Sequence, residues 1–166
     1  MAEKKTVQFL WLIITAVMIL SVTPFLTAED RFIDNGDGTV TDRVLNLMWS
    51  QRDNAADINW IDANRWVKFN FYYLLPGNKF DDWRMPTVNE LKSLFVNDET
   101  FEGVQTDCGM RVKITPQIKL TCGWIWSAEG KDISANVFTF RLGYFFSDLK
   151  MHQKAHRVLA VRDIKK

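Results

Sequence analysis

The sequence lacks the short motifs that mark common catalytic and cofactor-binding sites. It contains no Gly-x-Ser-x-Gly nucleophile motif, no phosphate-binding glycine loop and no Cys-x-x-Cys pair. No other group of residues in the chain points to a catalytic constellation. We therefore expect that the protein is not an enzyme and that it needs no cofactor.

Cysteine is almost absent, since Cys108 and Cys122 are the only two in 166 residues. One intrachain bridge is therefore the most that the chain can form. A structural disulfide is the default for such a pair in an oxidising compartment. The alternative is a catalytic or copper-binding pair of thiols, which needs surroundings that stabilise a thiolate. The sequence shows no such surroundings, so we predict a disulfide between the two residues.

The stretch DNGDGTVTD, residues 34–42, is rich in acidic residues and glycine but lacks the spacing of an EF-hand calcium loop. A loop that starts at Asp34 places Gly36 where a side-chain ligand is needed. A loop that starts at Asn35 places Val40 where glycine is required. The Asn-Gly and Asp-Gly pairs instead favour a tight turn between two strands, so we predict a β-hairpin.

His152 and His156 have the spacing of a zinc site on a helix, but the glutamate that follows the first histidine in such motifs is missing. They lie in a polar stretch between predicted strands, so we interpret them as solvated side chains and predict no metal site. Trp124 and Trp126 lie on the same face of a predicted strand. The simplest interpretation places them in the core; if exposed, they would suit stacking on a sugar ring.

Residues 1–28 differ in composition from the rest of the chain. Residues 7–22, VQFLWLIITAVMILSV, form an apolar run that follows Lys4 and Lys5. The run is shorter than the ~20 residues that span a bilayer, and near the upper length of a secretory signal segment. Leu26-Thr27-Ala28 offers a small-residue cleavage site. We predict a hydrophobic helix that serves as a signal peptide or a membrane anchor, and either places residues 29–166 outside the cytoplasm.

Residues 29–166 have the pattern of one packed α+β domain. Seven tryptophans and an aromatic content of 13% indicate a real core. We predict one helix over Trp60–Leu75 and a second after Thr87, where Thr87 and Glu90 form a capping-box pattern. Asn97–Cys122 has little periodicity and is predicted to be a long loop. Strands beside the hairpin and in the last third of the domain are predicted at Phe32–Ile33, Trp124–Ser127, Asn136–Phe140, Tyr144–Phe146 and Arg157–Arg162.

Four segments follow one another as do the signatures of a known family: RFIDNGDGTVTDRVLNLMW, DDWRMPTVNELKSLF, WIWSAE and HRVLAVRD. On these segments residues 31–163 resemble the Lcl C-terminal domain family. The family is related in fold to C-type lectin-like and formylglycine-generating enzyme domains. The resemblance implies a secreted or surface-exposed C-type lectin-like domain, with two helices packed on small mixed or antiparallel sheets beside a long loop region.

The resemblance further implies that the first and last strands pair. It also implies binding, sometimes of sulfated polysaccharide, rather than catalysis. The chain departs from the family pattern at Asn46, where glycine is usual, and at Met85, where leucine is common. The Glu-Pro-Asn and Trp-Asn-Asp motifs of calcium-dependent sugar binding are both missing.

Charge is divided unequally along the domain although its total is balanced. Residues 29–109 carry 15 acidic and 8 basic side chains, whereas residues 110–166 carry 4 acidic and 11 basic ones. The two parts therefore have net charges of −7 and +7. Such asymmetry either neutralises itself in the folded domain or marks an interaction surface. If it marks a surface, the candidate ligand-binding residues are Arg111, Lys113, Lys119, Lys131, Arg141, Lys150 and Lys154.

We predict an exported ligand-binding or adhesion module that recognises a polysaccharide or another polyanion at this basic surface. One alternative is a membrane-anchored accessory subunit of a larger complex, in which residues 7–22 stay in the membrane and a protein is the partner. The other is a formylglycine-generating-type enzyme, which free thiols at Cys108 and Cys122 would favour. We expect no nucleic-acid partner.

Overall fold

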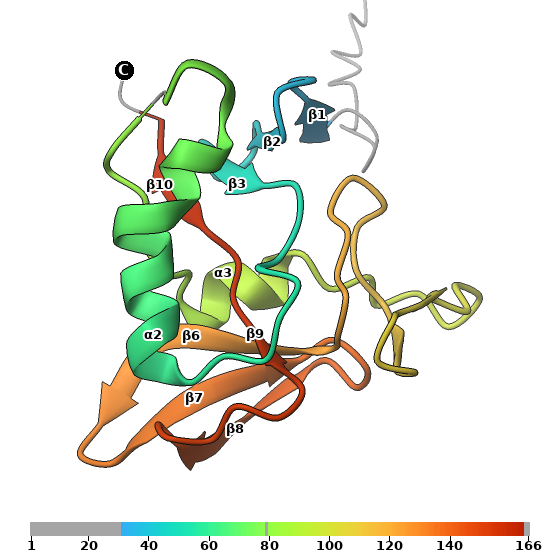
Figure 1. Ribbon diagram of the computed structural model, residues 1–166. Coiled ribbons are helices and arrows are strands. Elements are labelled where there is room, and N and C mark those ends of the chain that lie inside the picture. Colours follow the sequence, from blue (N-terminus) through green and yellow to red (C-terminus); the bar gives the residue numbers. More distant parts are fainter. Residues whose placement is uncertain (1–30, 79, 165–166) are drawn as a thin grey trace, which may run out of the picture.

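The domain is an α+β fold in which two four-stranded sheets are joined by the C-terminal run of the chain (Figure 1). The computed structural model describes residues 31–78 and 80–164. The α+β class predicted from the sequence is therefore confirmed. The predicted signal peptide or anchor falls on residues 1–28, which lie outside the described residues. Within the described part of the chain, no helix is long and apolar enough to cross a membrane.

The first sheet contains both ends of the described domain. Its strands run antiparallel in the order β1-β2-β3-β10. Gly36 and Gly38 connect the first two strands with positive φ values of 72° and 86°, a conformation that glycine adopts without strain. The predicted hairpin is thus confirmed. The strands are β1 (Phe32–Asp34), β2 (Thr39–Asp42), β3 (Leu47–Ser50) and β10 (Val161–Asp163).

The first and last strands share this sheet, but they do not pair with each other, so the implied pairing is wrong. The hairpin turn fixes β1 beside β2, at one edge of the sheet. The last strand pairs instead with β3 at the other edge, where Val161 lies opposite Trp49. The two middle strands therefore separate the ends of the domain.

The run Arg157–Arg162 is buried throughout, as predicted, but it is not one strand. Its start belongs to β9 (His156–Arg157), which pairs parallel with a strand of the second sheet. Its end belongs to β10 of the first sheet. Between them, the Ser50 backbone N–H donates to the carbonyl of Ala160 at 2.8 Å. This bond to the last residue of β3 engages the middle of the run, which crosses between the two sheets in Figure 1.

The second sheet follows the long loop region in the sequence. Its strands have the order β8-β7-β6-β9, so β8 lies at an edge. The pairing of β6 with β7 is irregular between Trp126 and Gly130. The antiparallel strands are β6 (Trp124–Lys131), β7 (Ser134–Thr139) and β8 (Tyr144–Leu149), which confirms the strands predicted here.

The first predicted helix is present, but it changes type along its length. It consists of α2 (Trp60–Arg65), the π-helical segment η1 (Trp66–Asn70) and the 3₁₀ segment η2 (Phe71–Leu74). The Asn59 side chain caps it by accepting a hydrogen bond from the backbone of the third helical residue. The buried side chains are spaced four positions apart: Ala63, Val67, Phe71 and Leu75. A spacing of four exceeds the 3.6-residue turn of an α-helix, and the wider π turn keeps these side chains on one face.

The second helix, α3 (Val88–Ser93), begins as predicted. The Thr87 Oγ1 accepts a hydrogen bond from the Glu90 N–H at 3.2 Å. In return, the Glu90 Oε2 accepts one from the Thr87 N–H at 2.7 Å. The capping box is therefore confirmed, and Val88 and Leu91 face the core.

The two faces of the second sheet pack against different helices. Ile125 and Phe138 share a hydrophobic cluster with residues of α3. Their strand neighbours Trp126 and Val137 share the other cluster with residues of α2 and η1. Because successive strand residues point to opposite faces, the sheet is covered on both sides.

The long loop region lies on one side of the molecule, away from α2 (Figure 1). It contains a short hairpin of β4 (Val104–Gln105) and β5 (Arg111–Val112). The disulfide Cys108–Cys122, with Cα atoms 5.3 Å apart, ties this region to the residues just before β6. The predicted disulfide is therefore confirmed.

Candidate functional site

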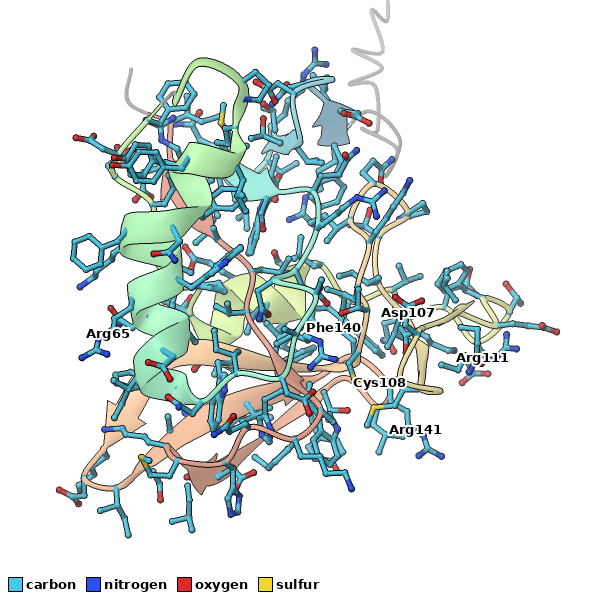
Figure 2. All side chains as sticks on the ribbon, viewed as in Figure 1. Arg65, Asp107, Cys108, Arg111, Phe140 and Arg141 are labelled. Carbon is cyan, nitrogen blue, oxygen red and sulfur yellow. A yellow bond between two sulfur atoms is a disulfide. The ribbon has the colours of Figure 1, made fainter. Side chains whose placement is uncertain are left out.

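The basic residues proposed from the sequence do not form one continuous surface. Arg111 and Arg141 lie on the same side of the molecule as Cys108 in Figure 2. Lys131 and Lys150 lie at the other end of the second sheet, where the β6–β7 hairpin turns and β8 ends. One extended ligand would have to contact both ends of this sheet to use all four.

Several of these cations already have partners. The Lys150 Nζ donates to the backbone carbonyl of Asp132 at 2.8 Å, and the Lys113 Nζ donates to that of Asp98 at 2.9 Å. Lys154 is exposed in the turn before β9. Lys119, another of the seven candidates, lines a hollow beside the loop region.

The two arginines at the ends of the C-terminal run are buried in ion pairs. The Arg157 guanidinium pairs with Asp57. The Nε of Arg162 lies 2.6 Å from the Asp82 Oδ1. Less than a tenth of either arginine side chain is exposed. Both hold the fold together, and neither is free to bind a ligand.

Three adjoining hollows surround the segment that follows β3. The first is about 400 Å³ and lies between this segment and the loop region. The others are about 310 Å³ and 220 Å³. The three hollows share lining residues, and we refer to them together as the Arg52 groove. A volume of this order suits a small ligand or one or two units of a polymer. The residues shared between hollows are Gln51, Arg52, Asp53, Pro116 and Lys119.

Two unpaired cations lie side by side in the Arg52 groove. Arg52 and Lys119 are partners in a parallel β-bridge, which the Lys119 N–H closes by donating to the Gln51 carbonyl at 2.9 Å. Both side chains are exposed, and neither bonds to or pairs with any residue that the structure describes. The backbone fixes where the two cations start, and their charged groups remain free to bind an anion.

Asp53 fixes the groove segment to the loop region. Its carboxylate accepts hydrogen bonds from the Thr121 N–H at 2.7 Å and the Thr121 hydroxyl at 2.9 Å. It also accepts one from the Ala55 N–H at 2.9 Å. Burial raises the pKa of Asp53, although these hydrogen bonds oppose the shift. With its carboxylate oxygens engaged by the protein, Asp53 is a structural residue of the groove.

The walls of the groove are largely apolar. Val112, Ile114 and Ile118 line its first hollow. Trp66, which is half-buried, lines the third together with Arg52. A tryptophan and an arginine that line one hollow can together hold a sugar ring and an acidic substituent on it.

Acidic residues also border the groove. Asp34 accepts a hydrogen bond from the Gln51 side chain at 2.6 Å and one from the Gly36 N–H, so it is already engaged. Asp107 is exposed on the loop region, on the same side as Arg111 (Figure 2). Asp107 therefore opposes the field of the two cations and lowers the affinity of the groove for an anion.

A separate aromatic hollow of about 270 Å³ lies at the β7–β8 turn. Trp124, Tyr144 and Phe146 line it together with Arg141. Trp124 is only half-buried here, whereas Trp126 is fully buried. The two tryptophans therefore have different surroundings, and only Trp124 has a face that a ligand could reach.

The two histidines also differ, so the interpretation that both are solvated is wrong for one of them. The exposed His152 has its Nδ1 2.6 Å from the Asp148 Oδ1. His156 is 2% exposed and stacks on Trp126, with ring centroids 4.5 Å apart. Its Nε2 lies 3.2 Å from the Asp148 Oδ2, but it is not aligned for a hydrogen bond. Burial lowers the pKa of His156, although Asp148 and the Lys154 carbonyl oppose the shift.

Sequence reasoning missed Arg52 because it lies in the part of the chain that carries the acidic excess. Its neighbour in the groove, Lys119, lies in the basic part, and nothing in the linear charge pattern joins the two. In the structure Arg52 lies two residues after the end of β3, in a loop, where binding residues are often found.

A family model described as the Lcl C-terminal domain matches residues 38–162. The match begins in the turn before β2 and ends within β10, so it covers both helices, the loop region, the second sheet and most of the first sheet. A search of curated proteins found no match.

Proposed function

The chain belongs to the Lcl C-terminal domain family, and we propose that it is an exported binding module whose Arg52 groove holds an anionic polysaccharide. The observation that carries this proposal is the pair of unpaired cations, Arg52 and Lys119, held side by side in a hollow by backbone hydrogen bonds. Sulfate and carboxylate groups of the polysaccharide bind these two cations. A neighbouring sugar ring packs on Trp66.

The energetics of such a site follow from its exposure. Charge-assisted hydrogen bonds to a guanidinium are worth about 1.5–3 kcal/mol in favourable settings, and less at an exposed site. Mobile ions screen exposed charges over about 8–10 Å at physiological salt, so binding weakens as salt rises. A repeating polymer compensates through several weak contacts that act together.

Export and a C-type lectin-like arrangement form part of the proposal. The disulfide supports an oxidising compartment, and it argues against a formylglycine-generating-type enzyme, which free thiols would have favoured. The presence of β1 and β10 in one sheet, with α2 and α3 on either face of the second sheet, supports the lectin-like arrangement.

The test is retention on immobilised heparin, measured as the salt concentration at which the protein elutes. The double variant Arg52→Gln/Lys119→Gln removes the two groove cations. The control Lys68→Gln/Lys92→Gln removes the same net charge from exposed sites outside the groove. We expect the groove variant to elute at clearly lower salt than the control. If both variants lower the elution salt equally, heparin responds only to the net charge of the protein. If the unmodified protein is not retained at low salt, a protein partner is favoured instead.

Asp107 offers a prediction of opposite sign. Asp107→Asn removes a negative charge from the border of the groove and leaves the size of the side chain nearly unchanged. The variant should elute from heparin at higher salt than the unmodified protein, because the field of Arg52 and Lys119 is then less opposed. An unchanged elution point would place the bound polymer away from this groove.

A further inference from the structure

The outer edge of β8 is an unpaired strand edge with few of the features that protect such edges. Among the residues that the structure describes, the strand pairs only with β7. Its sequence, Tyr-Phe-Phe-Ser-Asp-Leu, contains no proline and no lysine, and its single charge is Asp148. Tyr144 and Phe145 are each about half exposed, at 52% and 53%. Natural proteins usually block an exposed apolar edge with charge or proline, so an unblocked one marks a pairing site.

The register of β8 identifies which backbone groups face outward. The Lys150 N–H donates to the Ile133 carbonyl at 2.9 Å, so the even-numbered residues bond to β7. Phe145, Ser147 and Leu149 therefore direct their backbone groups away from the sheet. The Leu149 N–H is already occupied by the Asp148 Oδ1 at 2.7 Å. The free backbone donors on this edge are thus those of Phe145 and Ser147.

We propose that β8 pairs antiparallel with β8 of a second copy of this chain, about a two-fold axis at Phe146. In this register Phe145 lies opposite Ser147 of the second copy, and the reverse holds by symmetry. Four backbone hydrogen bonds then use both free donors and leave the occupied Leu149 N–H aside. The second sheet of one copy and the second sheet of the other then form one continuous eight-stranded sheet.

Side chains and charges agree with this register. The two Phe146 rings meet at the axis as a cross-strand aromatic pair. Tyr144 lies opposite Asp148 of the second copy, where its hydroxyl can donate to the carboxylate. Antiparallel pairing also brings Arg141, which pairs with no residue that the structure describes, to the end of the interface that carries Asp148 of the other copy. Lys150 lies at the same end, but its ammonium group already donates to the Asp132 carbonyl. This complementarity is why a second copy fits the edge, and the dimer does not depend on the proposed ligand.

The first test is the mass of the full chain in detergent, measured by light scattering, with and without Ser147→Pro. The Ser147 N–H faces outward, so proline there removes no hydrogen bond within the sheet. We expect the unmodified chain to be a dimer and the variant to have half its mass with unchanged circular dichroism. A monomeric unmodified chain, or a dimer that survives in a folded Ser147→Pro variant, would overturn the proposal.

The second test fixes the register by cysteine crosslinking of the full chain under mild oxidation. Residues on the axis in a non-hydrogen-bonded pair have Cα atoms about 4.5 Å apart, within the range of a disulfide. Phe146→Cys should therefore give a covalent dimer on a non-reducing gel. Asn89→Cys, exposed on α3, should not. Crosslinking through Ser147→Cys in preference to Phe146→Cys would refute the register, and equal crosslinking of Asn89→Cys would show collision rather than pairing.

Discussion

Glu90 should contribute more to stability than Thr87, although the capping box alone gives the opposite expectation. Glu90 accepts the Thr87 N–H, and it also receives two hydrogen bonds from the Arg84 guanidinium, at 2.9 and 2.7 Å. Arg84 in turn reaches Asp163 of β10 at 3.3 Å. One carboxylate therefore joins the start of α3 to the segment before it and, through Arg84, to the last strand.

The magnitudes follow from the burial of these groups. Thr87→Ala removes one cap and should cost about 1 kcal/mol, within a range of ~0.5–2. Glu90→Ala removes its half of the box and leaves Arg84 without its main partner. The exposed fractions of the Arg84 and Glu90 side chains are 35% and 16%. Solvent screening therefore reduces the usual ~1.5–3 kcal/mol of a charged hydrogen bond, and we expect a total cost of about 2 kcal/mol.

Urea unfolding of the single variants and of Glu90→Gln separates these contributions. Glutamine at this position keeps the capping box but loses the charge, so Glu90→Gln should fall between the unmodified protein and Glu90→Ala. A double-mutant cycle of Arg84→Ala with Glu90→Ala isolates the ion pair. The reasoning is refuted if Glu90→Ala costs no more than Thr87→Ala, or if Arg84 and Glu90 are additive.

The ion pair of Arg84 and Glu90 also predicts that the free energy of unfolding depends on pH. Burial alone raises the pKa of Glu90, but hydrogen bonds from Arg84 and Thr87 outweigh it and lower the pKa below the usual 4.5. The contribution of Glu90 is therefore complete above pH 4.5 and is lost as pH falls through the lowered pKa. The difference between Glu90→Gln and the unmodified protein should shrink over this range.

Three further predictions concern other parts of the fold. The free energy of unfolding should decline as pH falls below 6.5, because burial lowers the pKa of His156 and the unfolded chain takes up the proton first; His156→Gln should flatten this part of the profile, and an unaltered slope would argue against the burial. Reducing Cys108–Cys122 should lower stability by about 3 kcal/mol in urea unfolding, and no change would mean that the bridge adds nothing to the folded state. Gly143→Ala should lower the melting temperature, because φ is +76° and the new Cβ would lie 2.6 Å from the Phe95 ring; a neutral result would show that this ring moves freely.

Interactions between residues close in the sequence were predictable. The turn glycines set the β1–β2 hairpin, because positive φ at those positions is a local demand. Thr87 and Glu90 set the start of α3, because both partners of the box lie within one helical turn. The bridge Cys108–Cys122 was predictable for another reason: with two cysteines only one pairing exists.

Features that depend on distant partners were not predictable. The sequence shows an apolar run at Arg157–Arg162, but not that it crosses between two sheets. That depends on Ser50, more than a hundred positions earlier. The burial of His156 likewise depends on the ring of Trp126, which no local pattern places beside it.

The candidate site illustrates the same division. The sequence determined that this domain carries an excess of basic residues in its last part, and Lys119 was one of seven candidates named there. It did not determine which cations remain free, because an arginine is free only if the folded chain brings no carboxylate to it. Tertiary structure buried Arg157 and Arg162 against acidic partners and brought the free Arg52 beside Lys119. The sequence determines which residues are charged, whereas the pairing of those charges depends on distances that only the folded chain sets.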